Sequence, residues 1–392
     1  MSISENFLIH YLNRFDAIPF MVHHDGHSIK IGEGEPQFEV VVHGKIEKSA
    51  LLKSTSLALG EAYINKTLEI KGDLYKCLNS ILSQMDKFTT NRVALHSLLH
   101  TSTSKSNQKK EVTSHYNISN DFYSLWLDDS MSYSCAYFKH ESDTLNDAQK
   151  NKVDHLLHKL NLKEGMSLLD IGCGWGYLLI EAAKKYKIHG VGITLSEEQE
   201  KKFKERIQKE NLSDYLEVRL MDYRDLEHSN ELFDRVVSVG MIEHVGRKNY
   251  EEFMKTVNAV LKPSGIFVLH YISALREYSG DPFIKKYVFP GGVIPSLREI
   301  IQICGDINFY TIDVESLRRH YTKTLLCWLD NFNEHKEQIL TMFDESFVRM
   351  WELYLCSCAA SFANGVVDLH QLVLTKGCNN ELPMTRDYMY HN

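Results

Sequence analysis

A glycine-rich turn at the end of an apolar run carries the strongest chemical signal in this sequence. The segment reads Leu168-Leu-Asp-Ile-Gly-Cys-Gly-Trp-Gly176, in which glycines alternate with larger residues after Asp170. Glycine is needed where a backbone turns sharply or lets a ligand approach closely. Turns between a buried strand and a helix are also where α/β sheets bind nucleotide-like ligands. The segment therefore predicts a ligand-binding loop after a strand at 167–171.

The spacing of Gly172, Gly174 and Gly176 distinguishes between two classes of cofactor. The dinucleotide fingerprint is Gly-x-Gly-x-x-Gly, whereas this sequence has Asp-x-Gly-x-Gly-x-Gly. The latter pattern resembles motif I of the S-adenosylmethionine (SAM) methyltransferases. That resemblance implies a loop with room for an aminoacyl tail and a ribose, in which Asp170 orders the loop and helps to bind the ammonium group. The alternative is a turn that merely joins strand to helix.

Polar residues follow the other predicted strands at positions that a parallel sheet would bring to one edge. They lie in Thr194-Leu-Ser-Glu-Glu-Gln199, in Met221-Asp-Tyr-Arg-Asp225, at Glu243 and His244, and at His270. Each alone is more typical of a satisfied core or rim residue, and the first segment would also suit a plain helix N-cap. Because active sites gather at the carboxyl ends of parallel strands, their convergence favours a functional role.

Cys135 lies in the aromatic segment Ser132-Tyr-Ser-Cys-Ala-Tyr-Phe138, before the first strand of this sheet. Together with Glu243 and His270 it offers ligand types that zinc accepts. The three residues come from distant segments with no short paired spacing, so we expect no metal site. The eight cysteines of the chain have no regular spacing, which is typical of reduced thiols in a cytoplasmic protein.

Length and charge bound the class of protein. The chain has 392 residues and a formal net charge of -8, with a pI near 6.2. This length predicts two domains or one large one, and the acidic balance argues against a protein built to bind nucleic acid. The start has neither the basic region nor the apolar core of a secretory signal. No apolar run approaches the length that spans a bilayer.

The chain changes character at the polar, Ser/Thr-rich stretch 101–111, which we interpret as a linker. Residues 1–100 predict a small mixed α/β accessory domain, and residues 112–392 predict the catalytic domain. Apolar runs in the second region alternate with helical patterns, which indicates a doubly wound, mostly parallel α/β sheet of the SAM-methyltransferase type. The predicted strands are 167–171, 189–194, 216–220, 233–241 and 265–271, and the predicted helices include 177–186, 197–210 and 249–261.

The chain also resembles the cyclopropane-fatty-acyl-phospholipid synthase family, which includes the mycolic acid cyclopropane synthases. The resemblance covers residues 112–375 strongly and extends weakly into the N-terminal part, where Leu59-Gly-Glu-Ala-Tyr63 matches. The other matching segments are Tyr133-Ser-Cys-Ala-Tyr-Phe138, Leu169-Asp-Ile-Gly-Cys-Gly-Trp-Gly176, Gly192-Ile-Thr-Leu-Ser-Glu-Glu-Gln199, Met241-Ile-Glu-His-Val-Gly246, Tyr287-Val-Phe-Pro-Gly-Gly292, His320-Tyr-Thr-Lys-Thr-Leu325 and Cys358-Ala-Ala-Ser-Phe362.

The resemblance implies a reaction and the residues that serve it. A methylene group passes from SAM to the cis double bond of an unsaturated phospholipid acyl chain, and the carbocation closes to a cyclopropane when a bound bicarbonate removes a proton. The implied catalytic cradle for that anion is Cys135, Glu243, His270, Ile272 through its backbone, and Tyr321. The implied SAM contacts, besides Asp170, are Tyr133, Ser134, Gly172, Gly174, Gly176, Thr194, Leu195, Ser196, Gln199, Tyr223 and Arg224. Cys358 is a further catalytic candidate, which we interpret as a wall of the acyl pocket more than as a nucleophile.

The cradle contains an electrostatic conflict. A buried anion needs hydrogen-bond donors, which His270, Tyr321 and a backbone N–H provide, whereas an ionised Glu243 would repel it. We therefore expect a raised pKa for Glu243, or a proton shared between its carboxylate and the anion. Because a carbocation tolerates neither water nor strong nucleophiles, we also expect a dry apolar tunnel.

An enzyme without a membrane span must draw its lipid from the bilayer surface. The segment Phe283-Ile-Lys-Lys-Tyr-Val-Phe289 mixes apolar, aromatic and basic residues, which suit either a membrane interface or a packed helix with solvated lysines. By resemblance, the N-terminal domain aids membrane contact or dimerisation. We expect a cytoplasmic homodimer, peripheral on the inner membrane surface, whose partner is a bilayer of unsaturated phospholipid and not nucleic acid.

Other functions stay open at this point. Members of the family also add a methyl or methylene branch to an acyl chain without closing a ring, and a changed environment of Glu243 could redirect the cation in that way. A non-catalytic SAM- or lipid-binding module would have no use for Cys135, Glu243, His270 and Tyr321 together. A nucleic-acid methyltransferase is disfavoured by the net charge and by the absence of an Asn/Asp-Pro-Pro-aromatic segment after the fourth strand.

Overall fold

The computed structural model describes residues 3–84 and 119–390, so the expected linker at 101–111 lies outside the described residues. Contacts divide the chain into two compact units. The first unit combines the described part of residues 1–100 with the segments 279–290 and 325–366. The second combines the described part of residues 101–278 with the segments 291–324 and 367–390.

The first unit is built on a four-stranded sheet with the strand order β2-β1-β3-β4. Strand β1 pairs antiparallel with β2 and parallel with β3, and β3 pairs antiparallel with β4. The elements of this unit are α1 (Ile3–Leu12), β1 (Phe20–His24), β2 (His27–Ile31), β3 (Glu39–Val42), α2 (Lys48–Lys53), α3 (Thr55–Ile64), β4 (Leu68–Lys71), α4 (Leu74–Leu82), α12 (Pro282–Tyr287), α15 (Lys336–Met342) and α16 (Glu345–Ala363). The N-terminal region therefore has the small mixed α/β character that the sequence indicates.

The units differ from the expected boundary after residue 100, because two later segments return to pack with the N-terminal one. Helix α16 packs on α3 and α4, and α12 packs on α3. The guanidinium of Arg349 on α16 donates to the carbonyl oxygen of Tyr63 on α3 at 2.8 and 2.6 Å. The order of segments along the chain gives no signal of this return.

The segment 283–289, for which the sequence leaves two interpretations open, forms α12 and its C-terminal end. Phe283 is buried, and a side chain added at Gly60 of α3 would meet its ring at 2.5 Å. Lys286 forms an ion pair with Glu61, whose carboxylate also accepts a hydrogen bond from the hydroxyl of Tyr287 at 3.0 Å. The structure therefore favours a packed helix over a membrane-facing one for this segment.

The second unit holds a seven-stranded sheet with the strand order β10-β11-β9-β8-β5-β6-β7. Strands β5 to β9 pair in parallel, whereas β11 pairs antiparallel with β9 and with β10. The elements are α6 (Asn120–Ser124), α7 (Leu145–Lys159), β5 (Ser167–Ile171), α8 (Tyr177–Tyr186), β6 (His189–Thr194), α9 (Glu197–Lys209), β7 (Leu216–Leu220), η3 (Tyr223–His228), β8 (Phe233–Val239), α10 (Ile242–Val245), η4 (Arg247–Asn249), α11 (Tyr250–Val260), β9 (Leu261–Ser273), α13 (Leu297–Asp306), β10 (Phe309–Ser316), β11 (Asp368–Lys376) and α17 (Asp387–Tyr390). Helix α14 (Arg318–Glu334) begins in this unit and ends in the first. The expected doubly wound, mostly parallel sheet is thus confirmed.

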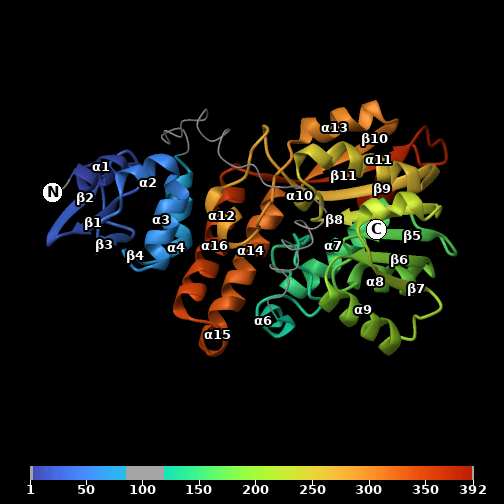
Figure 1. Ribbon diagram of the computed structural model, residues 1–392, viewed down its shortest axis with the longest axis horizontal. Helices are drawn as coiled ribbons and strands as arrows, with labels where there is room; N and C mark the ends of the chain where they lie inside the picture. The colour runs from blue at the N-terminus through green and yellow to red at the C-terminus, as the bar shows by residue number, and fades with distance from the viewer. Residues whose placement is uncertain (1–2, 85–118, 391–392) are drawn as a thin grey trace. The chain divides into compact units, whose positions relative to one another are not determined.

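Helices cover both faces of this sheet (Figure 1). Apolar side chains of α7, α8 and α9 form one core with the sheet, and those of η3, α11 and α13 form a second core. Leu168 belongs to the first core and Leu169 to the second, as expected for neighbours on a buried strand. A sheet buried on both faces explains why its parallel strands read as continuous apolar runs.

Local capping signals set the start of α7, the helix that carries Lys152 and Lys159. The hydroxyl of Thr144 accepts a hydrogen bond from the amide of Asp147, whose carboxylate accepts one from the amide of Thr144. This capping box satisfies two amides of the first turn and starts α7 at Leu145.

Among the described residues, no helix combines the length and the apolar character needed to cross a bilayer.

Candidate active site

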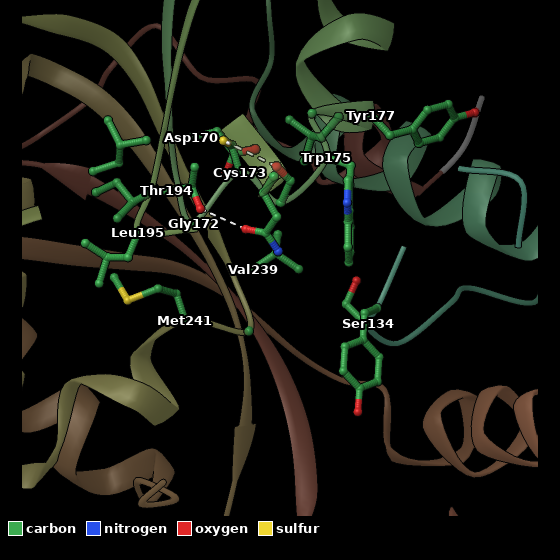
Figure 2. Close-up of a pocket in the computed structure, with 18 of the residues that line it drawn as sticks. Ser134, Asp170, Gly172, Cys173, Trp175, Tyr177, Thr194, Leu195, Val239 and Met241 are labelled. Carbon is green, nitrogen blue, oxygen red and sulfur yellow. Dashed lines mark hydrogen bonds between the residues drawn. The ribbon is translucent and has the colours of Figure 1, made fainter. Parts of the chain in front are cut away.

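A pocket opens at the carboxyl edge of the parallel strands, where the strand order reverses at β5. It is lined by the turns after β5, β6, β7 and β8 and by the segment 130–134. Figure 2 shows Thr194, Leu195 and Met241 on one side of the pocket and Ser134 and Trp175 on the other. The predicted cofactor residues that line it are Tyr133, Ser134, Asp170, Gly172, Gly174, Gly176, Thr194, Leu195, Gln199 and Tyr223. This edge is where doubly wound sheets bind ligands.

The turn after β5 requires glycine for both conformation and space. Gly172 has a φ of 86° and Gly176 a φ of 82°, values in the left-handed region that other residues rarely adopt. A side chain added at Gly172 would meet the side chain of Met241 at 3.0 Å, and one at Gly176 would overlap the ring of Phe203. Glycine at these two positions therefore lets the backbone turn tightly and leaves space for the side chains of Met241 and Phe203.

Asp170 is a buried carboxyl group at the end of β5. Its Oδ1 atom has no hydrogen-bond partner among the described residues. Burial raises the pKa of Asp170 to about 7, against the charge of Lys152, which lowers it. Since a buried polar atom without a partner is unfavourable, this oxygen is suited to accept a hydrogen bond from a cationic ligand group.

Helix α7 holds the segment 130–134 against the pocket. The Nζ atom of Lys152 donates to the hydroxyl of Ser134 at 3.2 Å and to that of Ser132 at 3.5 Å. The Nε2 atom of Gln149 donates to the carbonyl oxygen of Ser134 at 2.9 Å. Burial lowers the pKa of Lys152, whereas the carboxylate of Asp170, among other groups, raises it. Lys152 therefore anchors the segment 130–134 by hydrogen bonds, and its charge acts on Asp170, which lines the same pocket.

The residues at the end of β6 have two different roles, because some line the pocket and one caps a helix. The hydroxyl of Thr194 donates to Oε1 of Gln199 at 2.8 Å, and both residues line the pocket with Leu195. Ser196 does not line it. Its hydroxyl accepts a hydrogen bond from the amide of Gln199 at 3.3 Å as the N-cap of α9. Ser196 therefore caps the helix, which is the alternative interpretation of this segment, and its contact with the cofactor stays a prediction.

Tyr223 and Arg224 have different places at the end of β7. Tyr223 lines the pocket, and its buried hydroxyl has no hydrogen-bond partner among the described residues. Arg224 does not line it, and its guanidinium donates to Oδ1 and Oδ2 of Asp222 at 2.9 and 2.7 Å. Because Asp222 does line the pocket, Arg224 positions Asp222, and its own contact with the cofactor stays a prediction.

Glu243 lies in α10, in the connection that follows β8. Its Oε1 atom accepts a hydrogen bond from the amide of Ile272 at 2.7 Å, whereas Oε2 is buried with no partner among the described residues. Burial raises the pKa of Glu243 to about 7, and the contact with Ile272 lowers it. The raised pKa agrees with the expectation from the sequence. The amide of Ile272 donates to Glu243 here, and the expected contact of the Ile272 backbone with an anion stays a prediction.

His270 lies near the end of β9, directly beside the cofactor pocket. It pairs in register with Val239, and its carbonyl oxygen accepts a hydrogen bond from the amide of Gly240 at 2.8 Å. Both of these neighbours line the pocket. Burial, helped by the charge of Lys152, lowers the pKa of His270 well below its usual value. The imidazole is therefore neutral at physiological pH.

A series of contacts brings Cys135 and Tyr321 to the same edge. The Sγ atom of Cys135 lies 3.9 Å from the carbonyl oxygen of Leu317, which also accepts a hydrogen bond from the amide of Tyr321 at 3.2 Å. The amide of Leu317 donates to the carbonyl oxygen of Leu369 at 2.8 Å, and Leu369 pairs with Ile272. Burial raises the pKa of the Cys135 thiol, which is therefore protonated.

Cys358 lies on α16 in the first compact unit. Burial raises the pKa of its thiol to about 12. Since the thiolate is the nucleophilic form of cysteine, a thiol that holds its proton so strongly fits an apolar wall better than a nucleophile.

Sequence reasoning missed Lys152 and Gln371, which both lie inside the site region. Lys152 lines the pocket, and Nε2 of Gln371 lies 3.0 Å from Nδ1 of His270. A signal for Lys152 was present, because it shares the spacing of Gln149 and Leu156 on one face of α7, and all three are buried. Polar side chains on the apolar face of a helix indicate a buried polar contact.

Comparisons with known proteins bear on both units. Residues 103–372 match the family described as mycolic acid cyclopropane synthetase, and residues 7–93 match a domain of unknown function. The chain is 36% identical over 376 residues to a probable fatty acid methyltransferase from Pseudomonas putida, a match that covers 93% of this chain and 94% of that protein. It is 42% identical over 273 residues to the cyclopropane-fatty-acyl-phospholipid synthase of Escherichia coli (strain K12), with 69% of each chain covered.

A solved structure shows the same likeness in three dimensions. The mycolic acid cyclopropane synthase CmaA1 complexed with SAH and CTAB aligns with a TM-score of 0.64 and 33% identity. The alignment covers 68% of this chain and 98% of that chain.

Proposed function

This chain belongs to the mycolic acid cyclopropane synthetase family, and we propose that it transfers a methylene group from SAM to the cis double bond of unsaturated phospholipid acyl chains. Membership makes it a SAM-dependent methyltransferase of the cyclopropane synthase family. The proposal adds the phospholipid substrate, the ring product and a bound bicarbonate. The observation that carries it is that two buried polar atoms, Oε2 of Glu243 and Nε2 of His270, have no partner among the described residues. Glu243 is bound to the amide of Ile272, two residues after His270 on the same strand.

The residues of the cofactor pocket fit SAM. The Oδ1 atom of Asp170 is available to the ammonium group of an aminoacyl tail, and Gly172 keeps space where a Cβ atom would meet Met241. Tyr223 offers an aromatic ring at the end of β7, where we place the edge of the adenine. When bound, SAM supplies an electrophilic methyl group on a sulfonium centre.

The cradle residues fit a small anion such as bicarbonate, which would supply the base for ring closure. Because Oε1 of Glu243 accepts the hydrogen bond from Ile272, a proton on this carboxyl group belongs on Oε2. With a pKa of about 7, Glu243 is protonated in much of the protein near neutral pH. Glu243 then donates through Oε2–H, which removes the repulsion that an ionised carboxylate would exert on an anion.

The other cradle residues, Cys135 and Tyr321, protect a cation from unwanted reactions. The buried thiol of Cys135 holds its proton, so it offers no thiolate to capture a carbocation. Tyr321 is buried on the first turns of α14. Buried side chains of this kind exclude water from the reacting double bond, which protects a cation until the proton leaves.

A second candidate is the transfer of a methyl or methylene branch without ring closure. The relative that matches 93% of this chain carries the name of a probable fatty acid methyltransferase. Both reactions need SAM and an acyl double bond, and both pass through a cation after methyl transfer. A methyl-branched alkene forms when the acyl chain loses a proton. A methylene branch forms when a hydride shifts along the chain and the proton leaves the transferred methyl group, so a ring is distinguished from it by the bond that forms and not by the proton that leaves.

We further propose that the first compact unit serves membrane contact or dimerisation, in a cytoplasmic homodimer that is peripheral on the inner membrane surface. None of the residues that line the cofactor pocket belongs to this unit, which leaves it available for such a role. Sedimentation of the full chain, alone and with vesicles of unsaturated phospholipid, tests both parts. A monomer that does not sediment with vesicles would contradict this part of the proposal.

The purified protein, SAM and vesicles of cis-monounsaturated phospholipid provide the test of the reaction. The recovered lipid should show the upfield proton signals of a cyclopropane ring by NMR. A gain of mass without those signals would favour the branching reaction. Lipid that stays unchanged, while SAM still binds to the protein, would show that the phospholipid substrate is wrong.

A further inference from the structure

A buried row of hydrogen bonds runs from Glu315 through Lys159 and Gln371 to His270. The Nζ atom of Lys159 lies 2.5 Å from Oε2 of Glu315 and 2.8 Å from Oε1 of Gln371. The Nε2 atom of Gln371 lies 3.0 Å from Nδ1 of His270. Lys159 and Gln371 have no exposed surface, and neither has a role in the proposed reaction so far.

The fold places these residues with little freedom. Glu315 on β10 pairs with Gln371 on β11, and Gln371 pairs with His270 on β9. Residues directly opposite each other in antiparallel strands present their side chains on the same face of a sheet. Lys159 is the last residue of α7, the helix that also carries Lys152. The row is therefore fixed by the register of three strands and the end of one helix.

The chemistry of each group fixes the direction of the hydrogen bonds. A lysine ammonium can only donate, so the atom of Gln371 that Lys159 contacts must be the amide oxygen. The amide nitrogen of Gln371 then faces His270 and must donate to Nδ1. Because Nδ1 accepts, it carries no proton, and the single proton of the neutral ring belongs on Nε2.

Glu315 keeps the first member of the row charged. Burial raises the pKa of Glu315, but contacts with His155 and Lys159 outweigh it and lower that pKa to about 2. The carboxylate is thus ionised, and it accepts from His155 at 2.7 Å as well as from Lys159. Burial lowers the pKa of Lys159 while Glu315 raises it. The contacts of Lys159 therefore suit an ammonium group that donates to one carboxylate and one amide oxygen.

We propose that Gln371 and Lys159 are positioning residues that hold His270 as its Nε2–H tautomer, so that His270 donates a hydrogen bond to the anion in the cradle and does not accept the proton released on ring closure. The Nε2 atom is buried and has no partner among the described residues. The role toward the anion rests on the proposed function, whereas the tautomer rests on the row of hydrogen bonds alone. With Glu243 protonated on Oε2, the cradle then offers two donors to one anion.

Nitrogen NMR of the full chain with labelled histidine tests the tautomer without substrate or bicarbonate. The chain has 19 histidines, so the signals of His270 are assigned by their loss in His270→Asn. At a pH of about 8, where histidines are mostly neutral, Nε2 should show the shift of a protonated ring nitrogen and Nδ1 that of an unprotonated one. The opposite pattern, or an imidazolium, would overturn the proposal.

Gln371→Glu is the sharpest variant because it is nearly isosteric and keeps an acceptor for Lys159. A carboxylate cannot donate to Nδ1, so the proton of His270 should move to Nδ1 and leave Nε2 as an acceptor. We expect the temperature of thermal unfolding and the SAM affinity to stay unchanged. We expect kcat to fall by about 100-fold, as for loss of a group that acts in the transition state. Gln208→Glu, the same change at an exposed position of α9, should alter neither spectrum nor rate.

The outcomes separate this inference from the proposed function. A Gln371→Glu protein that folds and shows the wild-type pattern at His270 would refute the role of Gln371, whatever the lipid assay gives. If Gln371→Glu does not fold, the wild-type spectrum alone still decides the tautomer. Absence of a cyclopropane product in the vesicle assay would refute the proposed reaction and leave the tautomer to be judged by its own spectrum.

Discussion

The amide of Ile272 donates a hydrogen bond to Oε1 of Glu243 at 2.7 Å, across the gap between the end of β9 and the start of α10. This contact orients the carboxyl group and leaves Oε2 as its second, buried oxygen. Burial raises the pKa of Glu243 to about 7. A protonated Glu243 therefore acts as a hydrogen-bond donor through Oε2, in line with the raised pKa expected from the sequence.

Two substitutions at Glu243 separate a donor from a base. Glutamine keeps an oxygen for the amide of Ile272 and an N–H in place of Oε2–H, so Glu243→Gln should lower kcat by less than about 10-fold. Glu243→Leu removes both groups and should lower kcat by about 100-fold or more. Release of S-adenosylhomocysteine measures both rates. Glu227→Gln, at an exposed position of η3, is the matched control. If Glu243→Gln is as slow as Glu243→Leu, an ionisable carboxyl group is required there.

The pKa of Glu243 also makes stability depend on pH. The folded chain holds this proton up to a pH of about 7, whereas an unfolded chain releases it near its ordinary pKa of about 4.3. The folded state binds more protons between these values, so this group's contribution to stability falls as pH rises through that window. Relative to Glu243→Gln, the wild type should lose up to about 3 kcal/mol of unfolding free energy.

Urea unfolding at several pH values between about 4.5 and 8 measures this difference. The comparison with Glu243→Gln isolates one group, because Asp170 and the histidines are common to both proteins. Parallel curves for the two proteins would show that Glu243 ionises normally in the folded chain.

Lys152 should matter for cofactor binding, although it is not among the residues that the sequence indicates. Its ammonium donates to Ser134 at 3.2 Å and its charge acts on Asp170. A hydrogen bond from a charged group is worth about 1.5–3 kcal/mol, so Lys152→Met should weaken SAM binding by roughly 10-fold or more. Calorimetric titration measures the affinity. Lys150→Met, at an exposed position of the same helix, should bind SAM as the wild type does, and equal affinity in Lys152→Met would exclude this role.

Gly172→Ala should weaken both the fold and the cofactor site. A φ of 86° strains any other residue, and the added Cβ atom would meet Met241 at 3.0 Å. We expect a loss of about 1–3 kcal/mol in stability together with weaker SAM binding. Gly305→Ala is the matched control, because it lies within α13 with nothing within 4 Å of its added Cβ atom. Thermal unfolding should show Gly305→Ala at or above wild type, and an equal effect of both changes would contradict the steric argument.

The parallel strands could be predicted from the sequence because each is a buried apolar run that a turn signal ends. The bounds 167–171, 189–194 and 216–220 agree with β5, β6 and β7. The fourth predicted strand extends to 241, whereas β8 ends at Val239 because Gly240 adopts a positive φ of 65°. Strands β10 and β11 were not predicted, since antiparallel pairing between segments on either side of α14 to α16 leaves no local signal.

The site shows the same division between local and distant information. The glycine turn at 172–176 and Asp170 could be predicted from composition and spacing, and the structure places them in one pocket. Gln371 could not be predicted as a partner of His270, nor Lys159 as a partner of Gln371. The register of β9 and β11 brings the first pair together, and the packing of the end of α7 on the sheet brings the second. The resemblance implies SAM contacts for Ser196 and Arg224, and the structure shows a local partner for each, the amide of Gln199 and the carboxylate of Asp222.

The proposed reaction requires that a proton leaves the transferred methyl group and that a ring closes. Incubation of the protein with vesicles of cis-monounsaturated phospholipid and SAM that carries a trideuterated methyl group tests it directly, by mass spectrometry of the released acyl chains. Ring closure predicts that the acyl chain gains a carbon with two deuterium atoms, loses none of its own hydrogen and has no alkene carbons in its carbon NMR spectrum. The last readout separates a ring from a methylene branch, which has the same isotope content. A chain that keeps all three deuterium atoms and has lost one of its own hydrogens would show a branched alkene and contradict the account.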